Sequence, residues 1–279
     1  MKIGVSAFAW TTAFGASHLH LLPKVREHGL EGFEIPMFDP SDLAVSEIRR
    51  AFESADIDCT VCAILPAGIN PISPDPAVRA KSLAHLIQCI ETSAELGARL
   101  IGGPLFAPIG YLPGRRRTVE EWNWAVECFQ RLGEVLDASE ITLSIEPVNR
   151  SETFFLMTAT DAKAFCDAIA HRRVGVTIDT FHANIEEKNI AHAIRSLGSC
   201  LKHVHLSEND RGLLGSGHVD FPGIVNALRE LAYDGYLMIE GFGYAPDETA
   251  SLGALWGDLK VSPEDIAFRG ESYLKTLLR

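Results

Sequence analysis

Four residues of types that bind metal ions stand at the ends of the last four apolar, β-branched runs of this 279-residue chain: Glu146, Asp179, His205 and Glu240. A carboxylate directly after an apolar strand is unfavourable to bury unless it is paired or coordinates a cation. Each residue alone fits a polar side chain that caps a loop, but four at equivalent strand ends favour a shared site. Three carboxylates and one imidazole suit a hard to borderline divalent ion, and we expect Mn²⁺, with Co²⁺ or Mg²⁺ as alternatives.

The strands that would carry these residues belong to a repeating pattern. Eight short apolar runs predict strands at residues 3–8, 32–36, 59–64, 99–104, 141–147, 174–180, 202–207 and 237–241. Segments with helical periodicity lie between them, at residues 18–28, 42–54, 77–97, 119–136, 160–170, 190–197 and 221–231, and residues 263–278 close the chain.

Eight strand–helix units predict the fold class. Strands that are covered by helices on both faces have continuous apolar sequences, and the eight predicted strands have such sequences. Eight units in a chain of this length favour closure into a parallel (β/α)8 TIM barrel over an open doubly wound sheet. The carboxyl ends of barrel strands meet at one rim, so the four candidate ligands are expected to converge there. No linker divides the chain, and we expect residues 1–279 to form one catalytic domain.

Composition narrows the partners and the compartment. The chain carries 25 Lys and Arg against 37 Asp and Glu, a formal net charge of −12, which argues against nucleic acid as the partner. No stretch approaches the roughly 20 apolar residues of a membrane span, so we expect no membrane partner. The first residues run directly into a predicted strand, and the cysteines, including Cys59 and Cys62, fit buried thiols. We therefore expect a cytoplasmic protein.

Three segments of the chain closely resemble the D-tagatose and D-psicose 3-epimerase family of ketose epimerases, which belongs to the xylose-isomerase-like barrels. They are residues 145–152 (IEPVNRSE), 178–187 (IDTFHANIEE) and 203–211 (HVHLSENDR). Residues 215–221 and Ala254–Trp256 fit the same pattern, so the resemblance spans nearly the whole chain. It implies a metal-dependent isomerase that inverts C3 of a free ketose, and assembly as a homodimer or homotetramer.

The resemblance also implies roles for the residues at the strand ends. Residues that match Glu146, Asp179, His205 and Glu240 bind the metal in that family, and those that match Glu146 and Glu240 act as the acid–base pair at C3. Epimerisation removes a proton from one face of a carbon and delivers one to the opposite face, which two flanking carboxylates can do. The metal is expected to stabilise the enediolate that forms.

Three further residues match substrate contacts of the family. His182 and Arg211 match residues that contact the sugar near O1 and O2, and Glu152 matches one that hydrogen-bonds it. Without the resemblance these would be an exposed histidine at a helix start, an arginine in a surface ion pair and a solvated glutamate.

The amino-terminal half offers fewer signals. Glu34 ends the second predicted strand and fits either the rim of the site or a structural carboxylate. His203 shares a strand face with His205 but lies two residues deeper, and we interpret it as a core histidine. Four aromatic residues are candidates for the wall of the sugar pocket, with burial in the core as the alternative: Phe8, Trp10, Phe106 and Tyr111.

Phosphate recognition remains open at the sequence level. Residues 215–218 (GSGH) resemble a phosphate-binding loop but lack the third glycine of G-x-G-x-x-G, and Asp220 fits the cap of the following helix. Barrels often hold phosphate after strands seven and eight, so a phosphorylated sugar is an alternative to the free sugar that we expect.

Three other functions fit parts of the pattern. An aldose–ketose isomerase of the hydroxypyruvate-isomerase type would use the same ligands but move the proton between C1 and C2. An apurinic-endonuclease-like repair enzyme would need more histidine ligands and a basic rim. A non-catalytic sugar-binding barrel would not need both Glu146 and Glu240.

Overall fold

The computed structural model of the protein describes residues 1–242 and 260–279. Its strands are β1 (Lys2–Ser6), β2 (Gly32–Met37), β3 (Asp58–Ala63), β4 (Leu100–Gly103), β5 (Thr142–Ile145), β6 (Val174–Asp179), β7 (Leu201–Leu206) and β8 (Tyr236–Ile239). They form a closed parallel barrel in sequence order, in which β1 pairs with β8. The predicted TIM barrel is confirmed, and each predicted strand overlaps an observed one.

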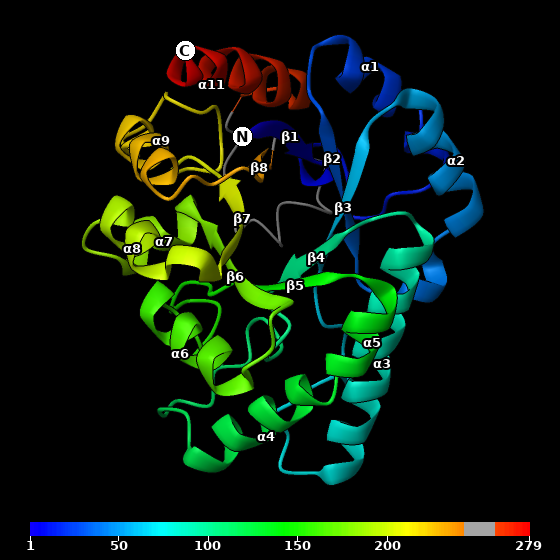
Figure 1. Ribbon diagram of the computed structural model, residues 1–279, viewed down its shortest axis with the longest axis vertical. Helices are drawn as coiled ribbons and strands as arrows, with labels where there is room; N and C mark the ends of the chain where they lie inside the picture. The colour runs from blue at the N-terminus through cyan, green and yellow to red at the C-terminus, as the bar shows by residue number, and fades with distance from the viewer. Residues whose placement is uncertain (243–259) are drawn as a thin grey trace.

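Helices surround the barrel, and the carboxyl-terminal helix α11 packs against β1 and α9 (Figure 1). The α-helices are α1 (Leu21–Glu27), α2 (Val45–Ala55), α3 (Pro76–Glu95), α4 (Val119–Gln130), α5 (Gly133–Ser139), α6 (Ala159–Ile169), α7 (Thr180–Glu186), α8 (Ile190–Leu197), α9 (Phe221–Glu230) and α11 (Gly270–Leu278). Short 3₁₀ turns are η1 (Ala7–Ala9), η2 (Ala16–His18), η3 (Pro40–Asp42) and η4 (Gly198–Cys200), and η5 (Asp265–Arg269) is a π-helical turn.

Side-chain caps set where many of these helices begin. Asp75, Thr118, Thr158 and Asn189 each accept a hydrogen bond from a backbone N–H in the first turn of the helix that follows. Asp220 does the same for α9, with 3.0 Å to the N–H of Gly223, so the predicted cap is confirmed.

The structure differs from the predictions made from the sequence at three places. Residues 119–136, predicted as one helix, form α4 and α5, which are separated by Arg131 and Leu132, just before Gly133, a residue type that weakens helix interiors. The first strand ends at Ser6, whose hydroxyl accepts from the N–H of Phe8 and starts η1. Helix α7 was not predicted, and it begins because the side chain of Asp179 accepts from the N–H of Phe181 at 2.9 Å.

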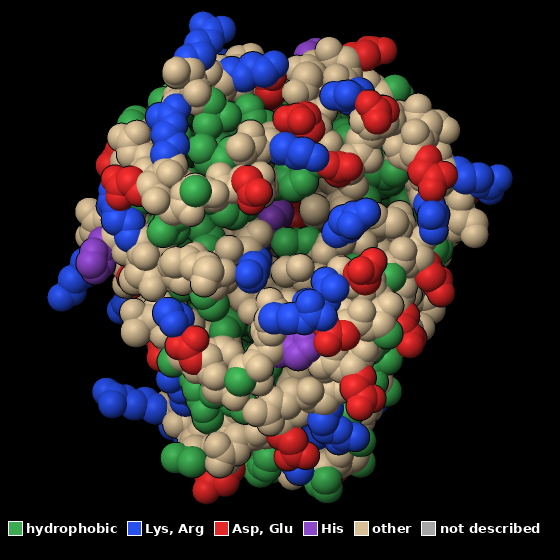
Figure 2. Space-filling model, viewed as in Figure 1, with side chains coloured by type: hydrophobic (Ala, Val, Ile, Leu, Met, Phe, Trp, Pro, Cys, Tyr) green, Lys and Arg blue, Asp and Glu red, His purple; other side chains and the backbone are tan. Residues whose placement is uncertain are grey.

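The apolar core fills the barrel and the layer between strands and helices, and strands β2 and β6 are buried along their whole length. Acidic and basic side chains are interspersed over the face shown in Figure 2. Among the described residues, none of the helices has the length and apolarity to cross a membrane. The segment Ala254–Trp256, which contributed to the family resemblance, lies outside the described residues.

Candidate active site and metal centre

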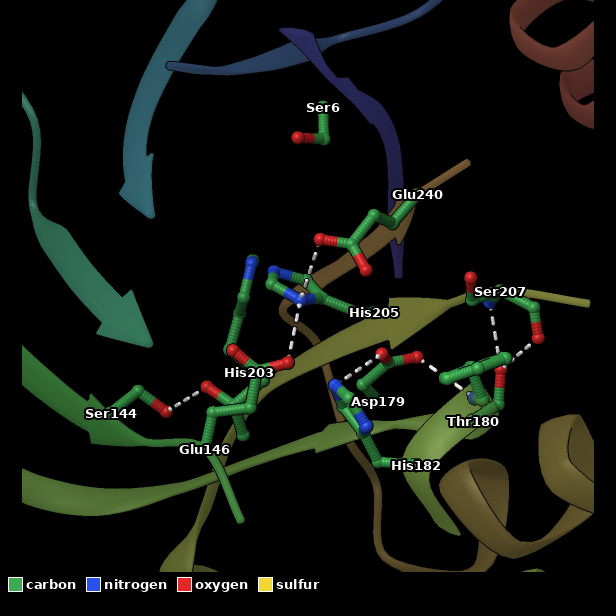
Figure 3. Close-up of polar contacts among 12 residues, drawn as sticks. Ser6, Ser144, Glu146, Asp179, Thr180, His182, His203, His205, Ser207 and Glu240 are labelled. Atoms are coloured by element: carbon green, nitrogen blue, oxygen red, sulfur yellow. Dashed lines mark hydrogen bonds and ion pairs between the residues drawn. The ribbon is translucent and has the colours of Figure 1, made fainter. Parts of the chain in front are cut away.

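The four predicted metal ligands come from neighbouring strands and point toward one another at the carboxyl-terminal rim (Figure 3). Asp179 and His205 are paired in the register of β6 and β7, and Glu146 and Glu240 directly follow β5 and β8. Each of the four side chains is buried, with no more than 4% of any residue exposed. The structure therefore brings the predicted residues to one place.

His205 lies between the two glutamates. Its Nδ1 is 3.3 Å from Oε1 of Glu146 and 3.6 Å from Oε1 of Glu240. The backbone N–H of Glu146 donates to the carbonyl oxygen of Gly103 at 3.1 Å. Gly103 has φ 124°, and a Cβ there would lie 2.2 Å from the carbonyl oxygen of Ala63, so only glycine allows this close approach beside the site.

Arg211 is the cation of the site. Its Nη1 donates to Oδ2 of Asp179 at 3.1 Å and to Oε2 of Glu240 at 2.8 Å. The guanidinium lies 3.9 Å from the ring centre of Phe181 and 4.9 Å from that of Phe242, which are cation–π contacts. Its φ of 63° is unusual for a residue with a side chain, and such strain is a recurrent feature of functional sites.

His182 and Glu152 are tied together by Asn149. The backbone N–H and the side-chain amide of Asn149 both approach Nδ1 of His182, at 3.2 and 2.9 Å, and the amide also donates to Oε1 of Glu152 at 2.8 Å. The other ring nitrogen, Nε2, lies 3.3 Å from Nη2 of Arg211 and 3.4 Å from Oδ2 of Asp179. Burial lowers the pKa of His182 well below its usual range, in keeping with a neutral ring.

The carboxylates of the cluster carry more negative charge than one arginine balances. Burial, together with the charges of Glu240 and Glu146, raises the pKa of Asp179 to about 8 despite the opposing effect of Arg211. Burial also raises the pKa of Glu240 and that of Glu152. A site that holds several carboxylates at this depth favours a further cation.

Two groups of side chains each offer ligand atoms within 4.8 Å of one another: Glu146, Asp179 and His182, and Glu34, His203 and His205. Of the predicted quartet, Glu146 and Asp179 are in the first group and His205 is in the second, whereas Glu240 is in neither. His205 contacts Glu146 of the first group and also Glu240. The oxygen-rich donors and the excess of buried carboxylate fit a divalent metal, so this is a candidate centre for one.

Glu34 and His203 lie in the barrel interior. Glu34 is 0% exposed and His203 1%, and Nε2 of His203 is 2.9 Å from Oε2 of Glu34. These contacts agree with the interpretation of Glu34 as a structural carboxylate. His203 has a buried hydrogen-bond partner, as a core histidine requires.

A small cavity of about 40 Å³ opens beside the carboxylate cluster. Its polar lining is Glu146, Glu152, His182, Arg211 and Glu240. Its apolar lining is Phe8, Cys62, Ile64, Pro104, Ile109, Val148 and Phe242. All three predicted substrate contacts thus line the same cavity as the predicted acid–base pair.

Only one of the four candidate aromatic residues lines this cavity. Phe8 stacks on Phe242, with 5.4 Å between ring centres. Phe106 is fully buried, Trp10 packs against Phe33, and Tyr111 is 36% exposed. These three are structural or surface residues in the described part of the chain.

The loop at residues 215–218 already has an internal anion. The carboxylate of Glu208, which is 0% exposed, accepts hydrogen bonds from the N–H groups of Gly215 at 2.9 Å and Val219 at 3.1 Å. Two backbone donors at the ends of this loop, those of Gly215 and Val219, are therefore occupied.

Two residues of the site were not predicted from the sequence, Asn149 and Phe242. Asn149 lies inside the family-like segment 145–152, and its place between two matched residues was the available signal. Phe242 follows Glu240 by two residues and had no pattern to distinguish it from a core aromatic.

Comparison with known proteins identifies the family of the chain. Residues 22–258 match the sequence model of the xylose isomerase-like TIM barrel family, and the chain belongs to that family.

Within the family the chain is similar to ketose epimerases along its whole length, which confirms the resemblance found in the sequence. It is 30% identical to the L-ribulose 3-epimerase of Mesorhizobium japonicum, over 98% of this chain and 93% of the relative. It is 30% identical to the ketose 3-epimerase of Arthrobacter globiformis, over 100% and 97%. The crystal structure of D-allulose 3-epimerase from Methylomonas sp. in complex with D-allulose has a TM-score of 0.93 at 26% identity, covering 99% and 96%.

Proposed function

We propose that this protein is a metal-dependent ketose 3-epimerase, which inverts C3 of a free ketohexose or ketopentose of the D-tagatose, D-psicose, D-fructose or ribulose type. The observation that carries the proposal is the convergence of Glu146 and Glu240 on one imidazole nitrogen inside a buried carboxylate cluster. The names of the relatives support the same reaction.

The acid–base roles of Glu146 and Glu240 follow from their places in the barrel. β5 and β8 are separated by two strands, so the two carboxylates approach the cavity from different sides of the rim. A sugar between them would present one face of C3 to each. One carboxylate removes the proton and the other delivers a proton to the opposite face, which inverts the carbon.

The proposed metal ligands are Glu146, Asp179, His205 and Glu240, and Mn²⁺ is the ion that we expect, with Co²⁺ or Mg²⁺ as alternatives. A bound divalent cation supplies Lewis-acid stabilisation for negative charge that develops on the sugar oxygens. Asp179 has a second duty, because its Oδ1 caps α7 and so fixes the direction of its other oxygen.

The proposed substrate contacts are Glu152, His182 and Arg211. They place hydrogen-bond donors and acceptors on one wall of the cavity, while Phe8, Ile64 and other apolar side chains form the rest. One wall can therefore bind sugar hydroxyls while ring and aliphatic carbons contact the other. The hydrogen bonds to Glu208 favour a free sugar over a phosphorylated one, because they use two donors of the loop after β7.

The test is metal-dependent epimer formation. The protein is stripped with a chelator, assayed, reloaded with Mn²⁺, Co²⁺ or Mg²⁺, and assayed again with D-tagatose, D-fructose, D-psicose and L-ribulose. We expect the C3 epimer of at least one ketose from the reloaded protein and none from the stripped protein. If an aldose is the only product, the protein is an aldose–ketose isomerase and the proposed function is wrong.

We also propose one catalytic domain over residues 1–279, a cytoplasmic location, and a homodimer or homotetramer. The six cysteines are free thiols, which suits a reducing compartment. Leu112, which is 48% exposed, borders a hollow of about 480 Å³ that is lined by Phe154 and Met157 and also by three arginines, and a second copy could cover its apolar part. Light scattering that gives two or four times 30.5 kDa would support the assembly, and a monomer would contradict it.

A further inference from the structure

Glu34 on β2 is a buried carboxylate that the proposed reaction does not use. Its Oε1 lies 2.9 Å from Nε2 of His205, and both residues are 0% exposed. The contact has the distance of an ion pair without the alignment of a hydrogen bond, and neither atom has a hydrogen-bond partner among the described residues. A buried carboxylate oxygen and a ring nitrogen this close repel each other unless the nitrogen carries a proton.

The two nitrogens of His205 therefore face different groups. Nδ1 faces Glu146 and Glu240 at the rim, whereas Nε2 faces Glu34 in the barrel interior. A neutral imidazole carries one proton, and a metal ligand must present its unprotonated nitrogen to the ion. With the proton on Nε2, the lone pair of Nδ1 points toward the carboxylates at the rim.

The other oxygen of Glu34 is held from two sides. Nε2 of His203 lies 2.9 Å from Oε2, and the hydroxyl of Thr60 on β3 donates to the same atom at 3.2 Å. Glu34 and Thr60 are paired in the register of β2 and β3, while His203 reaches across from β7. These contacts to Oε2 hold the carboxylate and so fix the place of its other oxygen beside Nε2 of His205.

We propose that Glu34 is a positioning residue that orients His205 and sets its tautomer for metal binding through Nδ1. The inference rests on the proposed metal site and adds a carboxylate–histidine–metal relay to it, in which His203 is the main contact of Oε2 and the longer contact of Thr60 is a minor one. Such outer partners typically change metal affinity about 10–100-fold when they are replaced.

The test is the Mn²⁺ affinity of Glu34→Gln, measured by electron paramagnetic resonance of free Mn²⁺ and independent of turnover. An amide has one oxygen and is neutral, so it cannot present a charged oxygen to His205 and a second oxygen to His203 and Thr60 at the same time. We expect the Kd to rise about 10–100-fold. Thr60→Val is the matched control, because it removes a buried contact of Oε2 and leaves Oε1 untouched, and we expect its Kd to rise no more than about threefold.

The outcomes separate this inference from the proposed function. If the wild-type protein binds no Mn²⁺, the metal site itself is wrong. If it binds one Mn²⁺ per chain and a folded Glu34→Gln protein binds equally well, only the role of Glu34 is overturned. Two ions per chain would also overturn it, because the group of Glu34, His203 and His205 would then hold a metal itself.

A second measurement covers the case in which Glu34→Gln does not fold. Nitrogen-15 NMR of the histidines in wild-type protein loaded with diamagnetic Mg²⁺ reports the tautomer of His205. A proton on Nε2 supports the inference, and a proton on Nδ1 overturns it.

Discussion

The two ends of the barrel differ in the burial of their charged side chains. At the carboxyl-terminal rim, the carboxylates of Glu146, Asp179 and Glu240 are buried, and Arg211 pairs with two of them, Asp179 and Glu240. At the amino-terminal end, charged residues line part of a hollow of about 470 Å³. Two of them, Lys2 and Asp58, form an ion pair at 2.7 Å. Those two side chains are 48% and 57% exposed.

The difference separates function from stability. Exposed pairs need no further partner, since water and each other's charge already stabilise them. Buried, incompletely balanced carboxylates lower stability unless something else binds there, so they indicate a site for a cation and a substrate. Substitutions at the rim should therefore change turnover strongly, and substitutions at the opposite end should change it little.

The largest effect is expected for Glu240→Gln. It removes a proton-transfer group and keeps the side chain's shape, so kcat should fall about 10²–10⁴-fold. Turnover and bound metal are measured on the same sample. Glu230→Gln, at an exposed ion pair with Arg195, is the control and should leave kcat unchanged. Near-normal turnover in a metal-loaded Glu240→Gln protein would remove the residue from the acid–base pair.

Arg211→Ala should act chiefly on substrate binding. The guanidinium donates to two carboxylates and lines the cavity, so KM should rise about 10–100-fold, as expected for the loss of hydrogen bonds from a charged group. Steady-state kinetics at saturating metal give KM and kcat separately. An unchanged KM would exclude Arg211 from the sugar pocket.

Phe8→Leu should give a smaller effect. The ring stacks on Phe242 and forms part of the apolar wall, so its loss weakens a contact worth about 0.5–1.5 kcal/mol. We expect KM to rise less than about tenfold with kcat little changed. A fall in kcat as large as that of Glu240→Gln would show that the apolar wall takes part in the chemistry.

Asp58→Asn, at the opposite end of the barrel, should give the smallest effect. The free energy of unfolding should fall by about 1 kcal/mol or less, with turnover unchanged. Burial alone would raise the pKa of Asp58, but hydrogen bonds from Lys2 and Tyr236 lower it overall. A lowered pKa gives a stabilisation that is present above the unfolded value of about 3.9 and is lost as the pH falls through the folded value.

Urea unfolding of both proteins between pH 7 and pH 2 measures this difference. It should be constant above about pH 5 and shrink in acid. A difference that grows as the pH falls would contradict the assignment.

The fold and the rim were largely predictable from the sequence. Four apolar runs each end in a polar residue: Glu146, Asp179, His205 or Glu240. This pattern can be recognised in the sequence without knowledge of tertiary contacts. The barrel then places such ends together, because parallel strands share a rim.

Contacts across the barrel were not predictable in this way. Glu34 lies on β2 and His205 on β7, and nothing in the spacing of the two residues along the chain indicates that their side chains meet. Helix α7 was also missed, because it depends on the cap that Asp179 provides more than on an apolar periodicity.

The most direct test of the central claim is the position of deuterium. The Mn²⁺-loaded protein is incubated in heavy water with each ketose, and every carbon is examined by NMR. The account predicts deuterium at C3 together with formation of the C3 epimer. Deuterium at C1 of the ketose or at C2 of an aldose product, with C3 unlabelled, would contradict it.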